Sequence, residues 1–356
     1  MGCQRLHDRC LLLSVSGSTI YDVAKVAGVA TSTVSRAFSS PDRISTPTRE
    51  RVLAVAAELG YRPNPHARAL LTGRHHTIAM VVSDITNPHY FELIRGAEQR
   101  AKASGCTLVL VNGEESARIE LEQVQRLVKS VDGFVLGASR LPDDNLRLIA
   151  AQRPIVLMNR ELEGLDSVVL DHQDGCRRIV EHLASLGHEH LLYLAGPRSS
   201  WMAATRWEAL RVAAAAIGVT AERIGPFTPK VAPGGAAADA ALSTEATAII
   251  AHNDLLAIGV MQRLAQRGFG VPDDVSVVGF DDIFAAALCT PRLTTLGGPH
   301  VDVGRGAVDL LLSAVGPVRQ DRAPIQVAVP AELSLRESTG PHDARRPRGP
   351  RRRTPG

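Results

Sequence analysis

The sequence predicts a small all-α domain at the N-terminus, followed by a larger α/β domain of two lobes. Residues 18–61 show helical periodicity without a strand-like run, whereas short apolar, β-branched runs alternate with amphipathic helical stretches from Thr77 onward. Such alternation is typical of a parallel sheet with helices on both faces. The region from 76 to 338 is longer than one such sheet needs, so we expect two lobes.

Composition narrows the class of protein. The chain has 356 residues, of which 45% are hydrophobic and 22% charged, as in folded domains rather than disordered chains. It contains no run of 18 apolar residues, so we expect no membrane partner, and Cys10–Val15 is too short for a signal-peptide core. Five scattered cysteines favour a reducing cytoplasm over a disulfide framework or a zinc site, so no metal site is expected.

Charge is unevenly distributed along the chain. The net charge is +3, yet residues 1–75 hold ten Arg or Lys against five Asp or Glu, and residues 341–356 hold six Arg against one Asp. The region between them is therefore acidic. A basic head on an acidic body indicates that the head binds a polyanion.

The head is expected to contain three helices. The first, Ile20–Ala27, has Thr19 as its expected N-cap, and Gly28 allows the left-handed turn that joins two crossed helices. The second spans Thr31–Phe38. The third, Thr48–Leu59, is expected to start after a proline and to pack its apolar face against the first two.

The second helix carries the polar pattern of a DNA reader. Its first turns present the short hydroxylated residues Thr31, Ser32, Thr33 and Ser35, followed by Arg36. Small side chains let a helix enter the major groove and contact phosphates or base edges, and an arginine can bind guanine through two hydrogen bonds. The pattern predicts a DNA-binding helix-turn-helix, although three-helix units that bind nothing share it.

In the α/β region, β-strands and helices are expected in alternation. The expected strands are Thr77–Val82, Thr107–Val111, Gly133–Leu136, Ile155–Met158, Ser167–Leu170, Leu191–Leu194, Ala248–Ala251 and Val275–Phe280. The expected helices are Pro88–Ser104, Arg118–Ser130, Asp174–Leu186, Trp201–Ile217 and Leu255–Arg267, with a loop and a helix start in Pro226–Ala241.

Candidate ligand-binding residues follow from the expected topology, because doubly wound sheets bind ligands beyond the carboxyl ends of their strands. Carboxylates and amides at such an edge suit a polyhydroxylated ligand, since a carboxylate accepts from two adjacent hydroxyls and an amide both donates and accepts. The polar residues that follow apolar runs are Asp84, Asn87, Asn112, Glu114, Asn159, Arg160, Asp171, Asn253, Asp254, Asp281 and Asp282.

Longer motifs give the chain a family resemblance. They include Thr19-Ile-Tyr-Asp-Val-Ala-Lys-Val-Ala-Gly-Val29, Leu59-Gly-Tyr-Arg-Pro-Asn64, Asp84-Ile-Thr-Asn-Pro88, Leu194-Ala-Gly-Pro197 and Val278-Gly-Phe-Asp-Asp282. Over residues 18–338 the chain resembles the LacI/GalR family of bacterial transcriptional regulators. The resemblance implies a helix-turn-helix DNA-binding domain and a two-lobed effector domain similar to periplasmic sugar-binding proteins.

In the head, the resemblance implies a set of DNA-binding residues. Leu70 matches a leucine wedge that enters the minor groove, although an ordinary helix anchor remains the alternative. Ala30 departs from the family pattern, which usually has serine there. The implied DNA-binding residues are Thr19, Tyr21, Thr31, Ser32, Thr33, Ser35, Arg36, Asn64, Ala67 and Leu70.

In the body, the resemblance implies effector-binding residues: His89, Tyr90, Asn159, Asp171, Arg206, Asn253, Asp281 and His300. Plainer alternatives stay open, because Arg206 could be solvated and Asp281 or Asp282 could cap a following helix. The segment Gly297-Gly-Pro-His departs from the family's usual Gln-Pro pair. An aromatic content of 4% favours a mono- or disaccharide over a long oligosaccharide, and a purine or other metabolite remains an alternative.

The expected domains are a flexible leader (1–17), the helix-turn-helix domain (18–64), a hinge (65–75), the effector domain (76–338) and a disordered basic tail (339–356). The expected partners are palindromic double-stranded DNA, a small-molecule effector and a second copy of the chain, with no cofactor. A transport receptor would need an export signal. An enzyme is not expected, because nucleophile-elbow, Walker and dinucleotide motifs are lacking.

Overall fold

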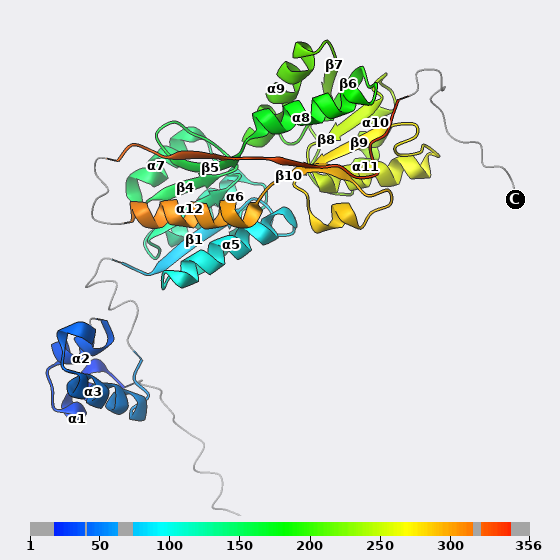
Figure 1. Ribbon diagram of the computed structural model, residues 1–356. Coiled ribbons are helices and arrows are strands. Elements are labelled where there is room, and N and C mark those ends of the chain that lie inside the picture. Colours follow the sequence, from blue (N-terminus) through cyan, green and yellow to red (C-terminus); the bar gives the residue numbers. More distant parts are fainter. Residues whose placement is uncertain (1–17, 40, 63–73, 316–321, 343–356) are drawn as a thin grey trace, which may run out of the picture. The chain divides into compact units, whose positions relative to one another are not determined.

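The structure, a computed structural model, describes residues 18–39, 41–62, 74–315 and 322–342 (Figure 1). The chain divides into two compact units, residues 1–75 and 76–356. The predicted leader lies outside the described residues. So do three of the predicted DNA-binding residues, Asn64, Ala67 and Leu70.

The described part of the first unit, the head, is all-α. Its elements are α1 (Ile20–Ala27), α2 (Thr31–Ser39), the 3-10 turn η1 (Pro41–Arg43) and α3 (Thr46–Glu58). Gly28 ends α1 with a φ of 63°, the left-handed conformation that favours glycine. Val23, Val34 and Val52, one from each helix, are fully buried and meet in one core. The third helix begins two residues earlier than predicted, because a proline in the first turn lacks only an N–H that the helix does not use.

The first lobe of the second unit contains a six-stranded parallel sheet. Its strand order is β11-β5-β4-β3-β1-β2. The strands are β1 (Thr77–Val82), β2 (Thr107–Asn112), β3 (Gly133–Gly137), β4 (Ile155–Met158), β5 (Asp166–Leu170) and β11 (Gln326–Val329). Their side chains feed two apolar layers, one on each face, in which Phe134, Leu136 and Met80 are fully buried.

The second lobe repeats this plan with one antiparallel edge strand. Its order is β12-β10-β9-β8-β6-β7, and β12 pairs antiparallel with β10. The strands are β6 (His190–Leu194), β7 (Thr220–Ile224), β8 (Ala248–Ala251), β9 (Ser276–Phe280), β10 (Thr294–Gly297) and β12 (Glu332–Ser334). A two-lobed α/β domain behind a helix-turn-helix head confirms the predicted fold class.

Helices cover both sheets (Figure 1). Those of the first lobe are α5 (His89–Ala103), α6 (Ala117–Leu127), α7 (Asp143–Gln152) and α12 (His300–Ala314). Those of the second lobe are α8 (His172–Ser185), α9 (Trp201–Ala216), α10 (Gly234–Ala241), α11 (Asp254–Gln266) and the 3-10 turn η2 (Phe284–Ala287). The chain passes between the lobes after β5, after β10 and again between β11 and β12, so α12 follows a second-lobe strand but packs on the first lobe.

Helices α5 and α12 touch through their backbones. A Cβ atom on Gly96 would lie 1.9 Å from the carbonyl oxygen of Val301, and one on Gly304 would lie 2.0 Å from that of Leu93. Only glycine permits this approach, which brings the first turns of the two helices together at one end of the first lobe.

One part of the sequence-based description needs correction. Residues 339–342 are not part of a disordered tail: His342 donates its backbone N–H to Leu186 and stacks its ring on buried His188. His188 lies 2.8 Å from Thr247 Oγ1 and 2.9 Å from Ser276 Oγ, so it ties the loop between α8 and β6 to the core. The elements that the sequence did not predict are α7, β7, β10, α12, β11 and β12.

Candidate functional site

The outer face of α2 carries the polar residues expected to meet DNA. Val34 and Ala37 face the core, whereas Ser32 and Arg36 are exposed. Their neighbours Thr31, Thr33 and Ser35 are half-buried. Tyr21, on α1, is 72% exposed. The helix therefore offers hydroxyl groups and one guanidinium group over an apolar core, the chemistry that contacts phosphates and base edges.

Thr19 has a defined structural role at the start of α1. Its hydroxyl donates to Asp22 Oδ2 at 2.7 Å, and its oxygen accepts from the backbone N–H of Asp22 at 3.4 Å. Asp22 Oδ2 in turn accepts from the backbone N–H of Thr19 at 2.8 Å. This reciprocal capping box confirms the predicted N-cap, and the hydrogen bonds lower the pKa of Asp22.

In the second unit, a cavity lies between the two lobes at the carboxyl ends of the strands. Its free space is about 40 Å³, which holds only a few water molecules. The lining residues are Ser83, Asn87, His89, Tyr90, Glu115, Ala138, Arg140, Asn159, Ser200, Met202, Arg206, Pro229, His252, Asn253 and Asp281. Of the predicted effector residues, this set includes His89, Tyr90, Asn159, Arg206, Asn253 and Asp281.

The backbone is strained around this cavity. Outside glycine, left-handed backbone occurs at the lining residues Glu115, Ala138, Asn159 and Asp281, with φ values of 56°, 50°, 55° and 102°. Each of them follows the end of a different strand. Strain of this kind is retained where the surrounding structure must aim a side chain, and it clusters at functional sites.

Arg206 lies at the centre of the second-lobe wall. It is 2% exposed, and its guanidinium donates to the backbone oxygen of His252 at 2.5 Å and to Asp281 Oδ1 at 3.1 Å. The same group lies over the ring of Phe280, 4.2 Å from its centroid. Its Nε has no hydrogen-bond partner among the described residues. Arg206 is therefore not solvated, and its buried positive charge faces the cavity beside a carboxylate.

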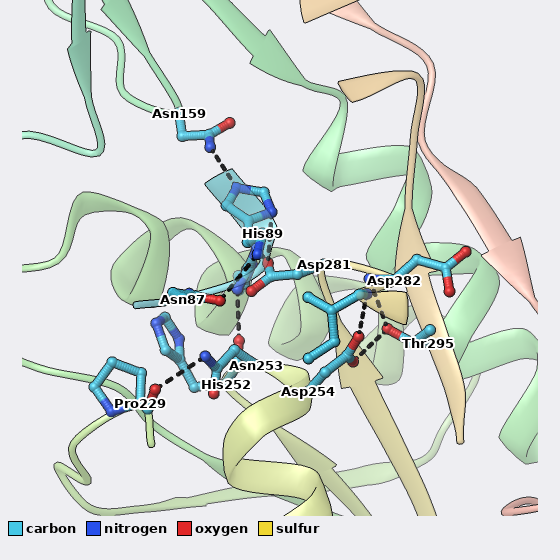
Figure 2. A network of polar contacts seen from close by, with 12 residues as sticks. Asn87, His89, Asn159, Pro229, His252, Asn253, Asp254, Asp281, Asp282 and Thr295 are labelled. Atoms are coloured by element: carbon cyan, nitrogen blue, oxygen red, sulfur yellow. Dashed lines mark hydrogen bonds and ion pairs between the residues drawn. The ribbon is translucent and has the colours of Figure 1, made fainter. Parts of the chain in front are cut away.

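His89 connects the two walls (Figure 2). Its Nε2 lies 3.0 Å from Asn159 Nδ2 and accepts from that amide, so the proton belongs on Nδ1, which lies 3.7 Å from Asp281 Oδ1. Burial lowers the pKa of His89 to about 4, so the ring is neutral at pH 7. His300 packs its ring edge on His89 and donates from Nε2 to the backbone oxygen of Asp281 at 2.8 Å. His300 thus supports the site without lining the cavity.

The first-lobe wall contains an ion pair that the sequence did not single out. Arg140 is buried and donates from Nε and Nη2 to Glu115 Oε2, at 2.8 and 2.5 Å. Its backbone N–H donates to the buried carboxyl of Glu120, whose pKa burial raises. Close by, Ser83 Oγ and Tyr90 OH are 2.6 Å apart. The strand-end rule pointed to Glu114, whereas the left-handed turn aims its neighbour Glu115 inward.

Several predicted residues lie away from the cavity. Asp171 accepts from the backbone N–H of Asp174 as the N-cap of α8, and lines a groove between α8 and α9. Asp254 is fully buried against Thr295 and the backbone of Ile283; burial raises its pKa. The remaining ones pair elsewhere: Asp282 with Arg336 and Ser334, Asp84 with Lys230, Asn112 with the backbone of Ile85, and Arg160 with Asp143.

The sequence matches two known families. Residues 19–64 match the bacterial regulatory proteins of the lacI family, and residues 180–339 match the periplasmic binding protein-like domain. Similar proteins include the transcriptional regulator DegA of Bacillus subtilis, 34% identical over 91% of this chain and 98% of that one. Another is the repressor CytR of Escherichia coli, 34% identical over 83% of this chain and 89% of that one. The chain belongs to the LacI family.

Solved structures agree with this assignment. The lac repressor dimer bound to operator and an anti-inducer superposes with a TM-score of 0.80 at 28% identity, over 91% of this chain and 99% of that one. The regulator CelR in complex with cellobiose superposes with a TM-score of 0.67 at 29% identity, over 90% of this chain and 99% of that one. A LacI-family regulator from Enterococcus faecium with bound ribose superposes with a TM-score of 0.66 at 27% identity, over 75% of this chain and 100% of that one.

This LacI-family chain is thus a transcription regulator with a helix-turn-helix DNA-binding domain and a periplasmic-binding-protein-like domain. Within the described ranges, no helix is long and apolar enough to cross a membrane. The same ranges contain no group of three or more His, Cys, Asp or Glu side chains arranged to hold a metal ion.

Proposed function

We propose that this regulator binds a palindromic operator as a dimer, acts as a repressor, and responds to a small sugar held between its two lobes. The cavity as described is smaller than a sugar, so the lobes move apart to admit it. The observation that carries the proposal is the cavity between the lobes, where the buried guanidinium of Arg206 lies beside the carboxylate of Asp281. A sugar hydroxyl can accept from the first group and donate to the second at the same time.

The cavity lining favours a sugar over a flat base. Amide, hydroxyl, carboxylate and guanidinium groups dominate the lining, and Tyr90 is its one Phe, Tyr or Trp residue. Tyr90 is 3% exposed, so little of its ring is available as a stacking surface. A purine, the alternative effector, gains much of its affinity from aromatic stacking. Two structurally similar regulators hold cellobiose and ribose, which supports the same ligand class here.

A dimer follows from the size of the reading surface. One α2 helix contacts only half a site, so two heads related by two-fold symmetry are needed for operator specificity. The structurally similar lac repressor is a dimer on its operator. An effector that bridges the lobes changes how they close, and through the dimer it changes whether both heads can hold one operator.

DNA binding is tested by fluorescence anisotropy of the full chain with inverted-repeat and random duplexes at fixed salt. We expect a clear preference for one inverted repeat. Arg36→Ala should weaken the free energy of operator binding by about 1–3 kcal/mol and relax specificity at one base pair. Equal weakening on every duplex would show that Arg36 contacts phosphate only. Absence of any preference for an inverted repeat contradicts the proposal.

Effector control is tested by repeating the titration with sugars and, as the competing arm, purine bases. We expect a sugar to change operator affinity, and Arg206→Ala to remove the response while DNA binding persists. Arg211→Ala is the control on the same helix, because Arg211 is exposed, pairs with Glu208 and does not line the cavity. If only purines change the operator affinity, the effector is a purine base and the proposed sugar effector is wrong.

A further inference from the structure

The cavity has a second ion pair, which belongs to the first lobe. Glu115 follows β2 and Arg140 follows β3, whereas Arg206 lies on α9 and Asp281 follows β9. All four line the same cavity. Each lobe therefore contributes one guanidinium and one carboxylate group to it.

The first-lobe pair is built as rigidly as the second-lobe pair. Glu115 is held in a left-handed turn, and its backbone N–H donates to Ser83 at 2.6 Å. Arg140 is 7% exposed, and its backbone is fixed by the buried carboxyl of Glu120 at 2.8 Å. A solvated surface pair needs none of these supports, so the structure fixes both groups in place at the cavity wall.

The four charged lining residues balance one another. Two guanidinium groups face two carboxylates, and the lining histidines add no charge at pH 7 because burial lowers the pKa of both His89 and His252. A phosphoryl group would bring a charge of about −1.5 to −2 into a buried space with no net positive charge to offset it. Such burial is costly unless the charge is paired.

We propose that Arg140 and Glu115 form a second sugar-binding pair, so that the effector is an uncharged sugar with hydroxyl groups at both ends, and phosphorylated sugars are rejected. This inference rests on the proposed sugar response and deepens it. Each lobe holds one end of the ligand: adjacent hydroxyls donate to the carboxylate and accept from the guanidinium of that lobe. Glu115 is then the residue that determines the preference for a neutral ligand.

The test titrates the full chain by calorimetry with D-ribose, D-glucose, D-galactose and D-fructose, and with a monophosphate of each. We expect at least one neutral sugar to bind at least tenfold more tightly than its own phosphate. Glu115→Gln should lower the affinity for that sugar by about tenfold or more, because it removes a charged hydrogen-bond acceptor. The same variant should also reduce the difference in affinity between the sugar and its phosphate.

Two variants make the outcome specific. Glu114→Gln is the matched control: the same substitution at the adjacent residue, also in left-handed backbone, but exposed and outside the lining. Glu115→Asp retains the charge, so it should keep the discrimination against phosphate while binding the neutral sugar more weakly. Thermal unfolding of each variant identifies any loss of folding.

The inference is overturned if a phosphorylated sugar binds more tightly than its neutral parent, or if Glu115→Gln behaves like Glu114→Gln toward a sugar that binds. Either result leaves the sugar-responsive regulator intact. Failure of every neutral and phosphorylated sugar to bind overturns the inference and the proposed sugar effector together, while operator binding is judged by its own titration.

Discussion

The head and the effector domain place their polar side chains in opposite ways. In the head, the core is made of Val and Ala, and the groups offered to DNA, such as Arg36, extend into solvent. In the effector domain, Arg206 and Asp281 are buried together. An exposed contact can be lost without unfolding the domain that carries it, whereas a buried ion pair serves binding and stability at once.

The largest test of this contrast compares two arginines. Arg206→Ala should lower the free energy of unfolding of the effector domain by about 3–5 kcal/mol, because it leaves Asp281 buried without its partner. Arg36→Ala should change the stability of the head by less than about 0.5 kcal/mol, because the side chain is exposed. Urea unfolding measures both. Similar losses for the two variants would erase the distinction.

A second test concerns the small core of the head. Val23→Ala should cost about 2 kcal/mol, because Val23 is fully buried and its methyl groups leave a cavity. Val26→Ala, one turn later on α1, is the matched control, since Val26 is 59% exposed. Thermal unfolding followed by circular dichroism compares the two variants. Equal destabilisation would mean that α1 does not pack as described.

Lowering the pH should reduce the stability of the effector domain but not that of the head. Burial lowers the pKa of His89, His172 and His252, so the folded domain binds fewer protons than the unfolded chain below about pH 6.5. Stability is therefore complete above that pH and is lost as the pH falls. His89 alone should cost on the order of 1 kcal/mol between pH 7.5 and 5.5.

Tryptophan fluorescence during urea unfolding measures this effect in one domain, because both tryptophans, Trp201 and Trp207, lie on α9. His172→Phe should reduce the pH dependence, since neither ring nitrogen of His172 has a hydrogen-bond partner among the described residues. His190→Gln, at an exposed position, should leave it unchanged. Residues 18–62 contain no histidine, so an equal acid effect on the head would contradict the assignment.

The smallest expected effect is at the start of α1. Thr19→Ala should cost the head about 1 kcal/mol, because it removes the hydroxyl of the capping box, and Thr19→Ser should restore most of it. Thermal unfolding of the two variants measures the difference. An unchanged midpoint for Thr19→Ala would show that the cap does not contribute to the stability of the head.

The sequence predicted the buried strands well and named several residues that line the cavity. The runs Thr77–Val82, Ile155–Met158 and Ala248–Ala251 occur with the predicted bounds, because β-branched and apolar residues stop abruptly at turns. Arg206, Asn253 and Asp281, implied by the family resemblance, lie at the cavity.

Other features depend on tertiary contacts that the sequence pattern does not show. Helix α12 was missed because Gly304 and Gly306 weaken its helical signal, although Gly304 is required by the contact with α5. Glu115 and Arg140 were missed because the direction of their side chains depends on the turns that follow the strands. Asp171 was misplaced because its side chain bonds to its own helix.

The close contacts of Gly96 with Val301 and of Gly304 with Leu93 join distant parts of the first lobe. Helices α5 and α12 begin beside the cavity at His89 and His300, and their touching backbones make them one stiff unit. Each helix is roughly 22 Å long, so the joined pair reaches from the cavity wall toward the opposite end of the lobe. The far end of α5 lies next to the first β1–β2 rung, Thr77 with Thr107, where the chain arrives from the head. The joined helices therefore connect the wall of the cavity with the edge of the sheet at which the chain enters the lobe.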